Sequence, residues 1–156
     1  MKILFKLIVI FFLFTSISSA ELIKPNSNLK PFDVLMIQLN SLKNNDNPFK
    51  DAGIEQTWEF AHPNNKALTG PLERFKQMIY SDNYKILISH QNNKTIILKE
   101  SVNKFVYKVY VLSKDKKKYY YIWQIEKVKE GKFKNCWMTT GVSDPIFVGE
   151  IIWVKN

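Results

Sequence analysis

The feature that most constrains the fold is a change in the spacing of apolar residues near Tyr84. Before Tyr84, apolar residues recur every three or four positions, which is typical of amphipathic helices. After Tyr84, they alternate with polar residues or form β-branched and aromatic runs, which is typical of strands. Helical segments followed by strands indicate an α+β domain, because βαβ units would alternate the two patterns along the chain.

The first predicted helix begins at Pro31, because proline lacks the N–H group that is left unpaired in a first helical turn. The polar run at residues 44–48 ends this helix. The apolar residues of this segment share one helical face. They are Phe32, Leu35, Met36, Leu39 and Leu42.

Two shorter helices are expected next. One has Asp51 as its N-cap and is ended by Pro63, because the residue before a proline is disfavoured in helical geometry. Residues 64–68 are expected to form a loop. The other helix begins at Thr69-Gly70-Pro71, with Gly70 as the cap and Pro71 as the first helical residue.

The remainder of the chain predicts five or six strands joined by short turns, and therefore an antiparallel meander. The expected strands are residues 84–90, 94–100, 105–111, 119–127, 133–142 and 146–154. In the strand at 119–127, Tyr121, Trp123 and Ile125 share one face. Such a sheet is expected to curl strongly, with the three helices packed on one face and a cavity between the layers.

The first twenty residues have the layout of a secretory signal peptide. Two lysines precede the apolar run of residues 7–14, and small residues lead to a cleavage site after Ala20. The alternative is an uncleaved N-terminal anchor. We therefore expect an exported protein, periplasmic or secreted in a bacterium, with a flexible leader at 21–30 and one domain at 31–156. No second such apolar run follows, so no transmembrane segment is expected after cleavage.

The formal net charge of +9 invites an anionic partner. The lysines are dispersed, however, with one cluster at residues 116–118 that is expected at a turn. We therefore expect no nucleic-acid binding. Association with an anionic envelope surface stays open, and it predicts lysines gathered on one face with salt-sensitive binding.

Metal and cofactor sites are not expected. Two isolated histidines and one cysteine have no recognisable ligand spacing, and no glycine-rich phosphate loop is present. Cys136 is expected to be a buried apolar side chain, because a lone cysteine cannot form an internal disulfide.

The phrase F-A-x-P-x-N-K, at Phe60 to Lys66, is followed by T-G-P-x-x-R-F at Thr69 to Phe75. Together with residues 31–46 and Tyr84, these phrases resemble an uncharacterised exported bacterial family, domain-of-unknown-function family 4864. The resemblance covers residues 31–142. It implies a cone-shaped, cystatin-like fold similar to nuclear transport factor 2, and no established activity. That family usually has serine at the position of His62.

Three residues near this motif carry candidate chemistry. Arg74 is the only arginine, and its planar donor fork would hold a carboxylate or phosphate, or would pair with Glu59 to fix the loop. Glu59 and His62 are three residues apart on a helix and form a candidate catalytic acid–base pair. A surface pair of this kind is the alternative interpretation.

The candidate binding residues are Arg74, Asn65, Tyr84, Tyr121 and Trp123. Aromatic residues on one sheet face line a ligand pocket or simply form the core. The first functional hypothesis is a non-enzymatic module that binds a small ligand or a protein, and a homodimer through the open sheet face is a further expectation. The alternative is a cavity enzyme, an isomerase, dehydratase or hydrolase, acting on a small apolar substrate.

Overall fold

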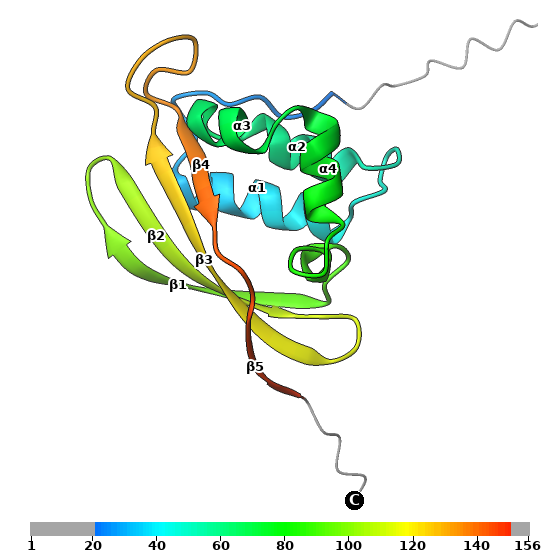
Figure 1. The fold of residues 1–156 in the computed structure, drawn as a ribbon. Helices are drawn as coiled ribbons and strands as arrows, with labels where there is room; N and C mark the ends of the chain where they lie inside the picture. Colours follow the sequence, from blue (N-terminus) through cyan, green and yellow to red (C-terminus); the bar gives the residue numbers. More distant parts are fainter. Residues whose placement is uncertain (1–20, 151–156) are drawn as a thin grey trace, which may run out of the picture.

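The structure, a computed structural model, describes residues 21–150. A helical layer covers one face of an antiparallel five-stranded sheet (Figure 1). The predicted α+β class and antiparallel sheet are therefore confirmed. The meander holds for the first four strands, whereas the fifth strand pairs with the third. The expected signal peptide at 1–20 and the end of the expected last strand at 151–154 lie outside the described residues.

Four α-helices form the helical layer, where the sequence predicted three. They are α1 (Pro31–Lys43), α2 (Ala52–Glu59), α3 (Pro63–Thr69) and α4 (Leu72–Ile79). The first helix has proline at its first position, as predicted, and buries Leu35, Leu39 and Leu42 of its apolar stripe. Phe32, which was expected on the same face, is 50 % exposed. The second begins directly after Asp51, also as predicted.

The prediction of a loop at 64–68 is wrong. The preceding helix α2 ends at Glu59, and Pro63 begins a new helix, α3. The ring nitrogen Nδ1 of His62 accepts a hydrogen bond from the backbone N–H of Asn64 (3.1 Å) and so caps α3. Proline suits the first position of that helix. Gly70 ends α3 instead of capping α4, and an added Cβ there would lie 2.6 Å from the carbonyl oxygen of Lys66.

The prediction of a strand at 84–90 is also wrong. These residues contain a 3₁₀ turn, η1 (Lys85–Leu87), so the helical part of the chain extends further than expected. The backbone N–H of Ser89 donates to the carbonyl of Leu42 at the end of α1 (3.0 Å). The apolar residues 86–88 pack into the core as a cluster, so no strand partner is used.

The sheet contains β1 (Asn92–Glu100), β2 (Lys104–Leu112), β3 (Lys117–Lys127), β4 (Trp137–Val142) and β5 (Ile146–Glu150). The strand order is β1-β2-β3-β4, and β5 also pairs with β3. The expected strand at 133–142 is shorter than predicted, because residues 129–136 form a loop. Cys136 is buried beside Val128 and Met138, as expected for an apolar side chain, and burial raises the pKa of its thiol.

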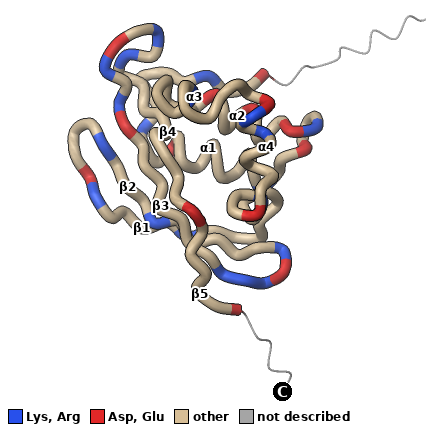
Figure 2. The backbone as a smooth tube through the Cα atoms, viewed as in Figure 1, with Lys and Arg blue, Asp and Glu red and all other residues tan. Residues whose placement is uncertain are grey.

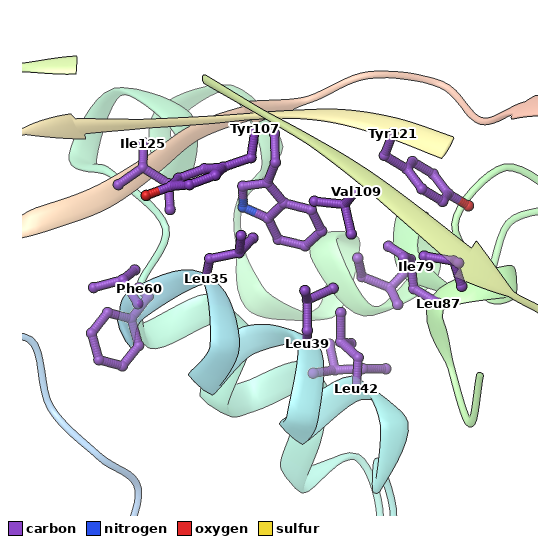
Figure 3. Close-up of a cluster of buried hydrophobic side chains, with 14 of the residues drawn as sticks. Leu35, Leu39, Leu42, Phe60, Ile79, Leu87, Tyr107, Val109, Tyr121 and Ile125 are labelled. Carbon is purple, nitrogen blue, oxygen red and sulfur yellow. The ribbon is translucent and has the colours of Figure 1, made fainter. Parts of the chain in front are cut away.

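The core lies between α1 and the inner sheet face, defined here as the face that the helices cover (Figure 3). Tyr121, Trp123 and Ile125 are fully buried there, which confirms the predicted alternation in this strand. They pack with Leu35 and Leu39 of α1. Each fully buried side chain of this size contributes about 1.5–3 kcal/mol to the free energy of folding.

The crossing of α1 and α2 depends on Gly53. A Cβ atom at this position would lie 2.1 Å from the carbonyl oxygen of Ser41 and 2.8 Å from the Cα of Asn45. Because both neighbours are backbone atoms, they cannot move away as a side chain would. The close approach lets the Gly53 N–H donate to the Asn45 carbonyl (2.8 Å).

We predict that Gly53→Ala lowers the free energy of unfolding by about 3 kcal/mol, at the upper end of overpacking effects. Urea denaturation followed by circular dichroism measures this change. Gly141→Ala is the matched control, because an added Cβ there meets nothing within 4 Å. Equal stability of the two variants would contradict the proposed close crossing.

His90 is a buried polar residue at the end of the turn that precedes β1, with 1 % of its surface exposed. Its Nδ1 lies 2.7 Å from the Leu87 carbonyl, and its Nε2 lies 3.0 Å from Nδ2 of Asn93. Because a carbonyl only accepts, Nδ1 carries the proton and Nε2 accepts from the Asn93 amide. Burial is the main cause that lowers the pKa of His90, and nearby Lys43 adds to it.

A lowered pKa in the folded state means that the unfolded chain binds this proton first as the pH falls. We therefore predict that His90 makes the protein less stable as the pH drops below about 6.5, by at most about 1.4 kcal/mol per pH unit. The loss stops below the folded-state pKa. Unfolding free energies measured from pH 7.5 to 5 should show a weaker pH dependence in His90→Gln. If that variant keeps the wild-type dependence, another group is responsible.

Candidate functional site

The helical layer and the sheet are joined at Thr139 of β4. Its backbone N–H donates to the Phe60 carbonyl (2.8 Å), and its carbonyl accepts from the N–H of His62 (2.8 Å). Ala61 therefore forms a one-residue parallel bridge with Thr139. This bridge fixes the segment between α2 and α3 against the end of the sheet.

The side chain of Thr139 continues the same connection inside the core. Its hydroxyl donates to Oε1 of Gln38 (2.6 Å) and accepts from the indole Nε1 of Trp123 (3.0 Å). Nε2 of Gln38 donates to the Thr57 carbonyl (3.1 Å). The network thus links α1, α2, β3 and β4, and its members satisfy one another away from water.

A cavity of about 120 Å³ lies beside this network, between the helices and the β3–β4 end of the sheet. Its apolar wall is formed by Leu42, Ala61, Phe75, Met78, Ile79, Tyr84, Leu87, Trp123, Gly141 and Val142. Its polar wall is formed by Gln38, Thr57, Asn65, Thr69 and Thr139. The cavity expected between the layers is therefore present.

Partly buried polar side chains on the cavity wall, Asn65 and Tyr84 among them, keep free hydrogen-bonding capacity. Nδ2 of Asn65 donates to the Thr139 carbonyl (3.3 Å), while its Oδ1 has no partner among residues 21–150. The hydroxyl of Tyr84 donates to the Val142 carbonyl (3.0 Å), so its oxygen can still accept. Burial raises the pKa of Tyr84, so this hydroxyl stays protonated at neutral pH. A ligand in the cavity would therefore meet acceptors here.

The structure brings together three of the five predicted binding residues. Asn65, Tyr84 and Trp123 all line the cavity. Tyr121 lies just outside it, stacked with Tyr84 at a ring distance of 6.4 Å, and its hydroxyl donates to the Asn83 carbonyl (2.8 Å). Arg74 does not line the cavity.

The pair expected between Arg74 and Glu59 is not formed, and a different cation, Lys76, links the helices. Arg74 is exposed and forms no salt bridge with any residue of the described range, and Glu59 pairs with Lys24 instead (3.2 Å). The amino group of Lys76 lies 2.9 Å from Glu55 and 3.9 Å from Asp51, which connects α4 to α2. The hydrogen bond to Glu55 is the main cause that raises the pKa of Lys76.

The candidate catalytic pair lies outside the cavity. Neither Glu59 nor His62 is among the residues that line it. The ring of His62 caps α3, and partial burial lowers its pKa. The carboxylate of Glu59 pairs with Lys24, and no hydrogen bond joins it to His62.

Gln38 and Thr139 were missed by the sequence analysis. A signal exists for Gln38, because it lies three residues after Leu35 and so interrupts the apolar stripe of α1. A polar residue inside such a stripe must find a buried partner. No local signal identifies Thr139 as that partner, since 101 positions separate the two residues.

Comparison with known proteins finds no match, neither among family models nor among curated proteins or solved structures. Within residues 21–150, no group of three side chains is arranged to hold a metal ion. The cavity and its hydrogen-bond network are therefore the features from which function is argued.

We predict that Thr139→Val lowers the free energy of unfolding by about 3 kcal/mol, because it leaves two buried groups, on Gln38 and Trp123, without a partner. The matched control is Thr140→Val, whose hydroxyl makes one longer bond, to the Gln124 carbonyl (3.4 Å). Urea denaturation measures both variants. The network would not be stabilising if Thr139→Val cost no more than its control.

Proposed function

We propose that this protein is a non-catalytic binding module that holds a small uncharged ligand in the cavity between the helices and β3–β4. One observation carries the proposal. The residues that line the cavity include no aspartate, glutamate, histidine, lysine or arginine. Tyr84 is the only titratable side chain among them, and its raised pKa keeps it neutral.

The size of the cavity limits the ligand. A cavity of about 150 Å³ accommodates benzene, so the 120 Å³ found here suits a molecule of a few heavy atoms. The largely apolar wall favours an apolar body. The free acceptor oxygens of Asn65 and Tyr84 favour one donor group, such as a hydroxyl. A charged ligand would lose its hydration without gaining an opposite charge.

The wall chemistry also favours binding over the enzymatic alternative. An isomerase, dehydratase or hydrolase of the expected kind needs an acid or base within hydrogen-bonding distance of the substrate. The candidate pair Glu59 and His62 does not line the cavity, and no other carboxylate or imidazole does so within the described chain. Catalysis through these residues would require another substrate position.

The export of the protein and its family resemblance are part of the same proposal. The charge and apolar layout of residues 1–20 supports an exported protein. Helices packed in the bend of an antiparallel sheet support a cone similar to nuclear transport factor 2 (Figure 1). No helix in the described part of the chain is long and apolar enough to cross a membrane.

Isopropanol is a suitable probe, because it combines a small apolar body of a few heavy atoms with one hydroxyl. We predict saturable chemical-shift changes of the Trp123 indole N–H and the Val142 amide when the protein is titrated with isopropanol. The Trp58 indole should respond less, because Trp58 does not line the cavity. Ala61→Val narrows the cavity and should weaken binding about tenfold, the effect of a steric penalty of about 1.4 kcal/mol.

Ala67→Val is the matched control, since Ala67 is exposed and lies outside the cavity wall. It should bind isopropanol as the wild type does. The proposal would be overturned if isopropanol produced no saturable shifts at Trp123, or if both variants reduced binding equally.

A further inference from the structure

The charge of the described chain is divided between its two halves. Residues 21–91, which hold the helices, contain eight basic and eight acidic residues and have no formal net charge. Residues 92–150, which hold the sheet, contain twelve lysines and six acidic residues, a formal net charge of +6. Figure 2 shows this lysine excess along the strands and their turns.

Several of these lysines project from the outer sheet face, the face opposite to the one that the helices cover. Three of them are at outward-facing positions of three neighbouring strands: Lys94 on β1, Lys108 on β2 and Lys118 on β3. The acidic residue on this face is Glu126, at the far end of β3, where it pairs with Lys104 (2.8 Å). The central part of the face is therefore positive without a compensating carboxylate.

Apolar side chains lie directly beside these lysines. In the register of the sheet, Lys94 is opposite Tyr110, and Lys118 is opposite Leu112. Lys108 lies between Ile96 and Ile122 on the neighbouring strands, with its amino group 4.5 Å from the ring centre of Tyr120. Each charge is thus set among apolar or aromatic groups.

The apolar part of this face is exposed and hollowed. Ile96, Ile146 and Val148 are 43 %, 46 % and 50 % exposed, respectively. A groove of about 570 Å³ runs over β1, β2, β3 and β5, with Lys94 and Lys118 among its walls. Covering this groove would remove apolar surface from water, which favours a partner that is itself partly apolar.

We propose that the outer sheet face docks on an anionic lipid bilayer. Exposed aliphatic side chains, tyrosines and lysines on one surface match the acyl boundary, the interface and the head groups of such a bilayer. The positive charges all come from lysine, a hydrated point charge that suits a fluid layer of head groups better than a fixed carboxylate partner. A second copy docked face to face would bring lysines against lysines.

Docking on a bilayer leaves the cavity on the other side of the sheet accessible, so the two proposals are independent. The test uses the full chain with vesicles of phosphatidylcholine, with and without phosphatidylglycerol, in a sedimentation assay. Binding is expected only with the anionic lipid. It should weaken between about 0.1 M and about 1 M salt, as the screening length falls from about 10 Å to about 3 Å.

Two pairs of variants locate the binding surface. Lys94→Gln/Lys118→Gln should weaken binding about 25-fold, at about fivefold per lysine. Lys43→Gln/Lys50→Gln changes the net charge equally on the helical side and should have a smaller effect.

The apolar side chains of the outer face are tested separately. Ile96→Ser/Val148→Ser should also weaken binding, whereas Leu68→Ser, at a position that is 73 % exposed in α3, should not. Residues 1–20 are the same in all variants, so differences in vesicle binding between variants come from the substituted positions.

Three results would overturn the proposal. Equal effects of the two lysine pairs would show that only net charge matters. A dimer in analytical ultracentrifugation that Lys94→Gln/Lys118→Gln dissociates would assign the face to a second copy. Binding to polyglutamate without binding to anionic vesicles would assign it to an acidic protein.

Discussion

The arrangement of this protein depends on the backbone and side-chain bonds of Thr139. Helices usually pack on a sheet through side chains alone, but here residues 60–62 and β4 exchange backbone hydrogen bonds (2.8 Å each). The chain between α2 and α3 therefore leaves helical geometry, since the Phe60 carbonyl and the His62 N–H bond to the strand. Pro63 resumes the helix directly afterwards because it has no N–H to satisfy. The short helices α2 and α3 follow from this one connection.

The same connection explains why the cavity interior is uncharged. The hydroxyl of Thr139 donates to Gln38 and accepts from Trp123, so each of these polar groups has a partner at the inner end of the cavity. Acceptor capacity remains on Oδ1 of Asn65 and on the hydroxyl oxygens of Tyr84, Thr57 and Thr69, which donate one hydrogen bond each. The ionic groups of the helical layer are placed elsewhere, around Lys76, where water lowers the cost of charge. A site of this kind selects a ligand by its shape and by a hydrogen-bond donor group.

The sequence predicted best what depends on local periodicity. The boundaries of α1 and the buried face of β3 follow from spacings of 3.6 and 2, and they are confirmed. The errors at 64–68 and 84–90 arose where single hydrogen bonds outside the periodic pattern decide. A local histidine cap begins α3, and Ser89 bonds to the distant end of α1. Asn65, Tyr84 and Trp123 line one cavity, and ligand binding by them stays a prediction. The partnership of Gln38 and Thr139 could not be predicted, because it joins residues 101 positions apart. The predicted pair of Arg74 with Glu59 is absent, since Glu59 pairs with Lys24.

The outer sheet face raises a further physical question, because a one-sided antiparallel sheet ordinarily presents polar residues to water. Lysines beside apolar residues are often a defence of an exposed edge strand against pairing with another chain. That explanation fits Lys94 on β1, which is an edge. It does not fit Lys108, since β2 is paired on both sides, or Lys118, which lies between Leu112 and Gly149. Lysines at positions without a free edge, set among exposed aliphatic groups, are accounted for by a partner that lies across the whole face.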